Sequence, residues 1–188
     1  MKHADTRVQF TRQKLRSAIM EILQQKPIDK VTVKELCDRA GLNRGTFYLH
    51  YDSPAALLKD IESQFLEENT RLFQSFWQEG RAQNMMEALF SCIKANGDVF
   101  CILTGPNGDP NFVAETFDSM RDGILDQWQL EFPHYNREDL DFIFDYVLVG
   151  STRLIVNWLN DSKGISATQF ANRMERLGHH ALMAIKEF

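Results

Sequence analysis

The sequence predicts an all-α fold of about nine helices. Apolar side chains recur at helical spacing along most of the chain, and residues that cap helices or turn the chain separate the apolar stretches. No stretch shows the sustained alternation of apolar and polar residues that marks a half-buried strand, so we expect no β-sheet. The remaining question at this level is where each helix begins and ends.

The first apolar stripe predicts a helix before Pro27. Its inward side chains fall at positions i, i+3, i+4, i+7 and i+8, namely Leu15, Ala18, Ile19, Ile22 and Leu23. Pro27 ends this helix, because proline lacks the N–H that a helix interior needs. The run Thr32-Val-Lys-Glu35 has the pattern of a capping box, in which the hydroxyl and the carboxylate each accept from an N–H at the helix start. A second helix therefore begins there, and Gly41 ends it in the left-handed conformation.

Two further helices follow closely. Asn43 is placed to cap a short third helix that runs to about His50. Ser53 and Pro54 predict the start of a fourth, with serine as N-cap and proline at the first helical position. The apolar pattern continues this fourth helix to about Trp77.

The remaining chain is expected to be helical as well. The predicted elements are a helix capped by Asn84, a short apolar segment to Leu103, a helix over about 111–130, a long helix from Asn136 to about Asp161, and a last helix capped by Ser166-Ala-Thr-Gln169. Breaks are predicted at Asn96-Gly97, Pro133 and Lys163-Gly164, and residues 105–110 form a turn-rich loop.

Charge divides the chain into two parts. Residues 1–52 hold ten Lys and Arg against six Asp and Glu, whereas residues 53–188 hold eleven against twenty. A basic head on an acidic body indicates that the head meets an anionic partner. We therefore predict a DNA-binding domain over 1–52, with a helix-turn-helix at about 32–51, and a second domain over 53–188.

Other classes of protein fit the composition poorly. No apolar run reaches the roughly 18 residues that a membrane span needs, and the polar start of the chain lacks the apolar core of a signal peptide, so we expect a cytoplasmic protein. Three cysteines without a Cys-x-x-Cys pair argue against a disulfide framework or a zinc site, and we expect no metal and no cofactor. Cys37 is expected to be buried, while a redox role for Cys92 or Cys101 stays open.

The second helix of the helix-turn-helix is the predicted DNA reader. A helix, a short turn with glycine and a second helix place the first turn of that second helix against base edges in the major groove. Arg44 and Thr46 point outward there, and arginine can pair with guanine while threonine can meet a thymine methyl. Gly45 would permit a close approach to DNA. The alternatives are that Arg44 is a solvated charge and that Gly45 is incidental.

Other polar side chains of the motif are predicted to hold phosphates, which position a protein without specifying sequence. These are Thr32 and Lys34 at the start of the second helix, and Tyr48 and His50 after the recognition residues. Alternatively, Tyr48 packs against the fourth helix and His50 is a surface histidine. For Tyr51, packing against the fourth helix is the favoured interpretation.

Residues 28–51, followed by Leu57-Leu58, closely resemble the DNA-binding head of the tetracycline-repressor (TetR) family, and the run Gly45-Thr-Phe-Tyr-x-His-Tyr51 is its most specific part. Residues 100–112 look like a region found in a subgroup with activators of dihydroxyacetone kinase genes. The resemblance implies an all-α homodimer, usually a repressor, with a small-molecule pocket in the body and a four-helix bundle formed by the last two helices of each copy. It also implies DNA contacts at Arg44, Gly45, Thr46, Tyr48 and His50. Pro54 departs from the family, which commonly has a phosphate-binding lysine there.

The body carries many aromatic residues, most of which should be core. Five are candidates for lining an effector pocket: Phe73, Trp77, Phe100, Trp128 and Phe144. Gly150 and Gly178 would permit close helix approach in a four-helix bundle. The expected partners are thus double-stranded, pseudo-palindromic operator DNA, a second copy of the chain and a small-molecule effector whose identity the sequence does not specify.

Two other functions compete with this hypothesis. An enzyme is disfavoured, because the sequence holds no nucleophile elbow, phosphate-binding loop, dinucleotide fingerprint or metalloprotease motif. A co-activator or protein-binding module could keep the same fold without reading an operator. The reading helix distinguishes this alternative, and here its side chains are competent to bind DNA.

Overall fold

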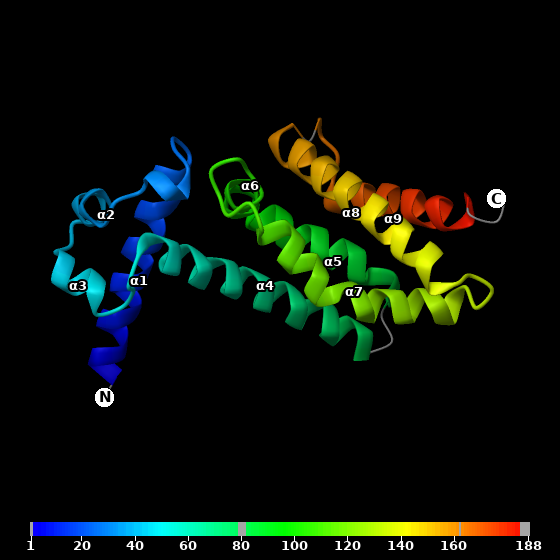
Figure 1. Ribbon diagram of the computed structural model, residues 1–188, viewed down its shortest axis with the longest axis horizontal. Helices are drawn as coiled ribbons and strands as arrows, with labels where there is room; N and C mark the ends of the chain where they lie inside the picture. Colours follow the sequence, from blue (N-terminus) through cyan, green and yellow to red (C-terminus); the bar gives the residue numbers. More distant parts are fainter. Residues whose placement is uncertain (1, 79–81, 162, 185–188) are drawn as a thin grey trace. The chain divides into compact units, whose positions relative to one another are not determined.

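Helices are the secondary structure of the described part of the chain, as the sequence predicts. A computed structural model describes residues 2–78, 82–161 and 163–184, which form nine α-helices and one 3-10 helix without any strand (Figure 1). The all-α prediction is therefore confirmed.

The helices gather into two compact units. The first unit comprises residues 1–68 together with 102–112, and the second comprises 69–101 together with 113–188. The long helix α4 (Pro54–Gln78) contributes to both. The predicted functional division at residue 52 stays a proposal, since the first compact unit also includes residues 53–68 and 102–112.

The first unit contains α1 (Lys2–Leu23), the 3-10 helix η1 (Ile28–Lys30), α2 (Val33–Ala40), α3 (Arg44–Tyr48) and the first half of α4. The predicted inward face of α1 is buried, and it packs with the inward faces of the neighbouring helices. The core side chains of these helices are Leu15, Ala18, Ile19, Ile22, Leu23, Leu36, Cys37, Phe47, Leu57, Leu58 and Ile61. This core fixes α2 and α3 on α1.

The loop after α6 (Gly97–Leu103) also belongs to the first unit. The side-chain amide of Asn107 donates to the carbonyl oxygen of Leu23 at 2.9 Å, and the N–H of Ile28 donates to the carbonyl oxygen of Asn107 at 3.1 Å. Gly108 is buried beneath this contact. A β-carbon there would lie 2.6 Å from the carbonyl oxygen of Leu103, so only glycine fits without a shift of the backbone. Asn107 thus holds the segment between α1 and η1.

Most helix starts follow the predicted caps. Thr32, Asn43, Ser53 and Asn136 each accept the N–H three residues on, and Ser166 and Gln169 cap each other reciprocally. Two predictions were wrong in detail. The Glu35 carboxylate binds the Lys26 ammonium rather than closing its capping box. Asn84 lies inside α5 (Ala82–Ala95) rather than before it, because the helix-favouring Ala82 and Gln83 extend the helix upstream.

The second unit is built from the rest of α4, α5, most of α6, α7 (Phe112–Glu131), α8 (Arg137–Asn160) and α9 (Ala167–Ala184). One aromatic cluster joins three of its helices: Trp158 stacks on Phe170 at 4.4 Å between ring centroids, and Phe90 meets Phe170 edge-on at 5.0 Å. A second apolar cluster holds α7, α8 and α9 together, with buried side chains Leu125, Tyr135, Leu140, Ile143, Phe144 and Leu182.

Charged pairs fasten α7 to α8. The Arg121 guanidinium donates to the carboxylates of Asp141 and Asp145, and it lies over the Phe144 ring. Both carboxylates raise the pKa of Arg121 above its ordinary value. Arg137 makes the converse bridge, donating to Asp122 and Asp126 on α7. These four carboxylates are partly or fully exposed, so each pair adds little stability alone and the network mainly fixes the register of the two helices.

Candidate nucleic-acid interface

Helices α2 and α3 form a helix-turn-helix in the first unit. Gly41 ends α2 with φ 64° and ψ 40°, the left-handed conformation that the sequence predicted, and the N–H of Leu42 donates to the carbonyl oxygen of Cys37. Asn43 then starts α3 after a three-residue turn. Phe47 is completely buried and anchors α3 on the core. The opposite surface of α3 is left facing solvent, as a reading helix requires.

The cap of α3 also involves Thr46. The Oδ1 atom of Asn43 accepts from the Thr46 N–H at 2.7 Å and from the Thr46 hydroxyl at 3.0 Å. In the structure the Thr46 hydroxyl thus serves the cap, and the residue is partly exposed. Arg44 is exposed at the first position of α3.

Gly45 is exposed between Arg44 and Thr46. A β-carbon at Gly45 would lie 3.3 Å from the Oδ1 atom of Asn43, closer than most such contacts. This gives a local reason for glycine that sequence reasoning missed: a larger residue would press on the capping oxygen. The predicted close approach of DNA at Gly45 stays a prediction.

At the end of α3 and directly after it, three residues present side chains of different kinds. Tyr48 is exposed and its ring meets the Phe47 ring edge-on, and His50 is half-buried. Sequence reasoning passed over Leu49, whose side chain is 82% exposed between them. An exposed leucine has no core role, so Leu49 is a candidate for apolar contact with sugar or thymine methyl groups. No sequence signal marks Leu49, because its exposure depends on how Phe47 packs in the core.

Tyr51 packs inward, as the favoured interpretation of the sequence held. Only 8% of the residue is exposed, and its hydroxyl donates to Asp60 on α4 at 2.7 Å. Burial, and then the hydrogen bond to the Asp60 carboxylate, raise the pKa of Tyr51 to about 12. Gln64 also donates to Asp60, and Arg16 of α1 donates to Gln64, so Tyr51 belongs to a polar network that joins α1 to α4.

The start of α2 is the other predicted phosphate site. Thr32 and Lys34 are exposed there and line a shallow hollow together with Glu35, Asp38 and Arg39. The free N–H groups of the first turn of α2 favour an anion at this place. The hollow has two cations, Arg39, which pairs with Glu21, and Lys34, for which the described residues show no ion pair.

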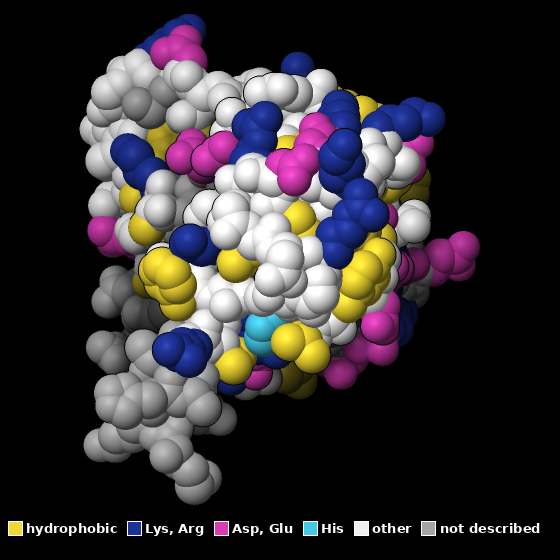
Figure 2. Space-filling view, turned by 90° about the vertical axis from the view of Figure 1, so that its left-hand side faces the viewer, with side chains coloured by type: hydrophobic (Ala, Val, Ile, Leu, Met, Phe, Trp, Pro, Cys, Tyr) yellow, Lys and Arg dark blue, Asp and Glu magenta, His cyan; other side chains and the backbone are white. Residues whose placement is uncertain are grey.

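Figure 2 shows the side of the molecule that carries this interface, with Lys and Arg side chains spread over it and Asp and Glu among them. Behind it, burial raises the pKa of the Cys37 thiol, as expected for a structural cysteine. Burial also raises the pKa of Cys101, which disfavours a reactive thiolate.

Of the five predicted effector-pocket residues, the structure brings Trp128 and Phe144 into contact. Phe100 and Phe144 are buried, and Trp128 packs edge-on against Phe144 at 6.2 Å between ring centroids. The side chains of Phe73 and Trp77 lie outside the described residues. The pocket therefore stays a prediction.

An all-helical chain with an exposed reading helix on a helix-turn-helix defines a DNA-binding transcriptional regulator. Family models support this class directly. Residues 15–61 match the bacterial regulatory proteins of the tetR family, and residues 80–180, more than half of the chain, match a transcriptional regulator C-terminal region of the same family. The chain belongs to the TetR family.

Curated relatives are themselves transcriptional regulators of the helix-turn-helix type. The chain is 33% identical over 54 residues to YvdT and 19% identical over 169 residues to YxbF, both uncharacterized regulators of Bacillus subtilis (strain 168). These matches include 29% and 87% of this chain, but only 28% of YvdT and 43% of YxbF. The matched part therefore spans less than half the length of either relative.

Solved structures of the same fold include three named regulators. NalD, the secondary repressor of a multidrug efflux pump in Pseudomonas aeruginosa, has a TM-score of 0.65 at 15% identity, covering 93% of this chain and 97% of NalD. FadR from Bacillus subtilis, solved with stearoyl-CoA, scores 0.58 at 14% identity over 88% and 96%. The dihydroxyacetone kinase operon activator DhaS scores 0.55 at 19% identity over 95% and 97%. At these identities the likeness concerns the fold.

Proposed function

We propose that the protein is a homodimeric, cytoplasmic transcriptional repressor that binds a pseudo-palindromic operator and is released from it by a small molecule. The observation that carries the proposal is the exposed surface of α3, where Arg44, Tyr48 and Leu49 face solvent while Phe47 anchors the helix. A protein-binding module would not need this set of DNA-competent side chains. We assign no enzymatic activity, in keeping with a family of regulators.

In this proposal the residues of the interface divide by role. Arg44 pairs with a guanine, the Thr46 methyl meets a thymine, and Gly45 leaves room for the DNA between them. Backbone phosphates are held by Thr32 and Lys34 at the start of α2 and by Tyr48 and His50 at the end of α3. Phosphate contacts fix the register, while the side chains of the first turn of α3 choose the sequence.

A second copy of the chain is proposed to cover α8 and α9. Phe142, Tyr146 and Val149 fall at i, i+4 and i+7 on α8, and each is more than 70% exposed. Leu177 on α9 is exposed as well. A β-carbon at Gly150 or Gly178 would meet nothing within 4 Å in this chain, so the chain's own packing does not require these glycines. Close approach of a helix from a partner chain would require glycine at these positions.

The apolar surface of α8 has a second possible occupant. By length and composition alone this helix is apolar enough to cross a membrane, with a mean hydropathy of 1.3 over its best window. The contacts of α8 favour a protein partner instead, because ion pairs with α7 and the aromatic cluster with α9 cover its other faces. A dimer interface explains an apolar stripe confined to one face.

Dimerisation would set the spacing of the two reading helices. Two copies of α3 about 34–36 Å apart would enter successive major grooves on one side of the DNA. An effector that favours another separation would weaken binding by a coupling free energy of about 1–3 kcal/mol. α4 is the natural lever, since its residues belong to both units. Phe73, Trp77, Phe100, Trp128 and Phe144 remain the proposed pocket residues.

An apolar effector is suggested by analogy with FadR of Bacillus subtilis, which was solved with stearoyl-CoA. Selection of bound duplexes from a random DNA pool by the purified full-length chain tests the proposal. The expected result is an enriched inverted repeat whose half-sites are centred one helical turn apart. A pool that stays random after repeated selection would overturn DNA reading, and an enriched site without symmetry would overturn the dimeric operator.

A further inference from the structure

The positive charge of the head is concentrated in one short stretch. Residues 7–16 contain Arg7, Arg12, Lys14 and Arg16 and no acidic residue. Residues 17–52, which include the whole helix-turn-helix, contain five Lys and Arg and five Asp and Glu and are therefore neutral. Since phosphate neutralisation supplies most non-specific affinity for DNA, the helix-turn-helix by itself is poorly charged for its task.

Ion pairs reduce the positive charge available in residues 17–52 further. Lys26 is held by Glu35, Arg39 by Glu21 at 3.3 Å, and Lys30 by Asp29 at 3.5 Å. Each of these cations already has a carboxylate that would compete with a phosphate. Within residues 17–52, Lys34 and Arg44 are the two cations for which the described part of the chain shows no ion pair.

The cations of α1 divide between its two flanks. Arg12 lies over the Tyr51 ring and Arg16 donates to Gln64 of α4, so this pair faces α4. Arg7 and Lys14 lie seven residues apart, which places both on one side of the helix. Phe10 lies on that side as well, 61% exposed, with the Lys14 ammonium 5.0 Å from its ring centroid.

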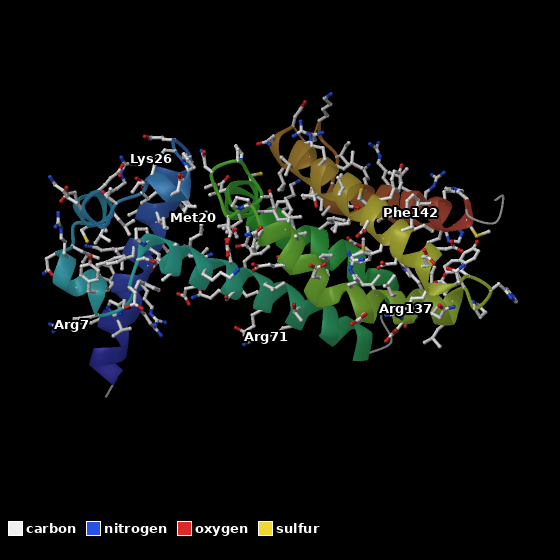
Figure 3. The ribbon with its side chains drawn as sticks, viewed as in Figure 1. Arg7, Met20, Lys26, Arg71, Arg137 and Phe142 are labelled. Atoms are coloured by element: carbon white, nitrogen blue, oxygen red, sulfur yellow. The ribbon has the colours of Figure 1, made fainter. Side chains whose placement is uncertain are left out.

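That side of α1 is the one on which the helix-turn-helix packs. Glu21 continues the same seven-residue spacing after Lys14, and its carboxylate binds Arg39 of α2. A line of side chains thus runs along α1 from its contact with α2 toward the N-terminus. In Figure 3, Arg7 lies on the N-terminal half of α1, on the side of the helix where α3 lies. Arg7 and Lys14 are both exposed.

We propose that the N-terminal half of α1 is a second DNA-binding surface, in which Arg7 and Lys14 bind backbone phosphates that flank the bases read by α3. Phe10 supports the Lys14 side chain in this arrangement. The inference rests on the proposed DNA binding and adds a site to it. Arg7, Phe10 and Lys14 lie outside the region that matches the tetR family model, which begins at residue 15.

The salt dependence of DNA binding tests this site. The dissociation constant of the full-length chain is measured between about 50 and 200 mM salt, on the selected duplex and on a random duplex. A plot of log affinity against log salt has a negative slope, and each lost phosphate contact makes it less steep by about 0.9. The double variant Arg7→Gln/Lys14→Gln should therefore make the slope less steep by about 1.8 on both duplexes. Lys163→Gln, which removes an exposed charge from the second unit, should leave the slope unchanged.

A charge-preserving variant distinguishes a phosphate contact from a structural role. Arg7→Lys/Lys14→Arg should keep the wild-type slope, because phosphate accepts either cation as a charge partner. A double glutamine variant that binds with the wild-type slope would overturn the second surface while leaving α3 as the reader. A wild-type chain that binds neither duplex would overturn the proposed function, and this inference with it.

Discussion

The side-chain amide of Asn107 donates to the carbonyl oxygen of Leu23 at 2.9 Å, across 84 residues of sequence. The carbonyl oxygen of Asn107 in turn accepts from the N–H of Ile28 at 3.1 Å. One residue from the loop between α6 and α7 therefore satisfies two backbone groups on either side of Pro27. These groups lie at the point where α1 ends and the chain turns toward the helix-turn-helix.

Replacing Asn107 should loosen the first unit. Asn107→Ala removes the bond to the half-buried carbonyl of Leu23, and we expect a loss of about 1–2 kcal/mol in the free energy of unfolding. Urea unfolding followed by circular dichroism measures the change. Asn111→Ala is the matched control, because the Asn111 side chain in the same loop is exposed. Equal stability of the two variants would mean that the hydrogen bond from the Asn107 amide does not stabilise the folded protein.

Two glycine substitutions should act in opposite directions. Gly108→Ala places a β-carbon 2.6 Å and 2.7 Å from two backbone carbonyl oxygens, and we expect a loss of about 2–3 kcal/mol as the loop shifts. Gly123→Ala fills open space on the exposed side of α7 and should gain up to about 1 kcal/mol from helix propensity. Melting temperatures check both signs, and a neutral Gly108 variant would contradict the close packing described above.

Tyr51 gives a prediction about alkaline pH. Its pKa is raised to about 12, so the stability that the protonated phenol provides is fully present below pH 10, its unfolded value, and is lost as the pH rises toward 12. Tyr51→Phe should be less stable by about 1 kcal/mol at pH 8, because the bond to Asp60 is missing. The difference from wild type should shrink above pH 10.

Urea midpoints of wild type and Tyr51→Phe at pH 8 and at pH 10.5 measure this convergence. Tyr48→Phe serves as the control, since that phenol is exposed on α3. A constant difference between the Tyr51→Phe variant and wild type across the range would refute the linkage.

Arg44 should contribute to sequence discrimination rather than to general affinity. We expect Arg44→Ala to reduce the preference for the selected duplex over a random one by about 1–3 kcal/mol. Competition binding with both duplexes measures this preference. An equal loss on the two duplexes would show that Arg44 binds phosphate instead, and Lys34→Ala supplies the pattern expected of such a contact.

The exposed stripe of α8 predicts the oligomeric state. The wild-type chain should be a dimer by light scattering at micromolar concentration, and Tyr146→Glu should be a monomer because it buries a charge in the proposed interface. Leu130→Glu is the control, since that exposed leucine lies at the end of α7. A wild-type monomer would remove the basis for a symmetric operator.

The features that sequence predicted well are those decided within a few residues. The caps at Thr32, Asn43 and Ser53 and the left-handed turn at Gly41 depend on local hydrogen bonds and dihedral angles, and the structure confirms each. The inward face of α1 follows from apolar spacing alone, and it is buried as expected. These local signals were enough to place the reading helix.

Features decided by distant contacts escaped prediction. Glu35 pairs with Lys26 because of how α1 and α2 pack. Asn107 contacts Leu23, which lies 84 residues earlier in the sequence. The exposure of Leu49 likewise shows only once the core around Phe47 is built. The effector pocket could not be predicted for the same reason. The apolar pattern of a helix is the same whether its side chains fill a core or line a cavity.

The path of the chain bears on how such regulators can be recombined. A chimaera joined at residue 52 would carry α1, α2 and α3 onto a foreign body without the loop that satisfies Leu23 and Ile28. The two backbone groups would then depend on water or on whatever residue the new body offers. To transplant the DNA-binding unit of this protein intact, residues 102–112 have to be transferred together with residues 1–68, although the two segments are not adjacent in the sequence.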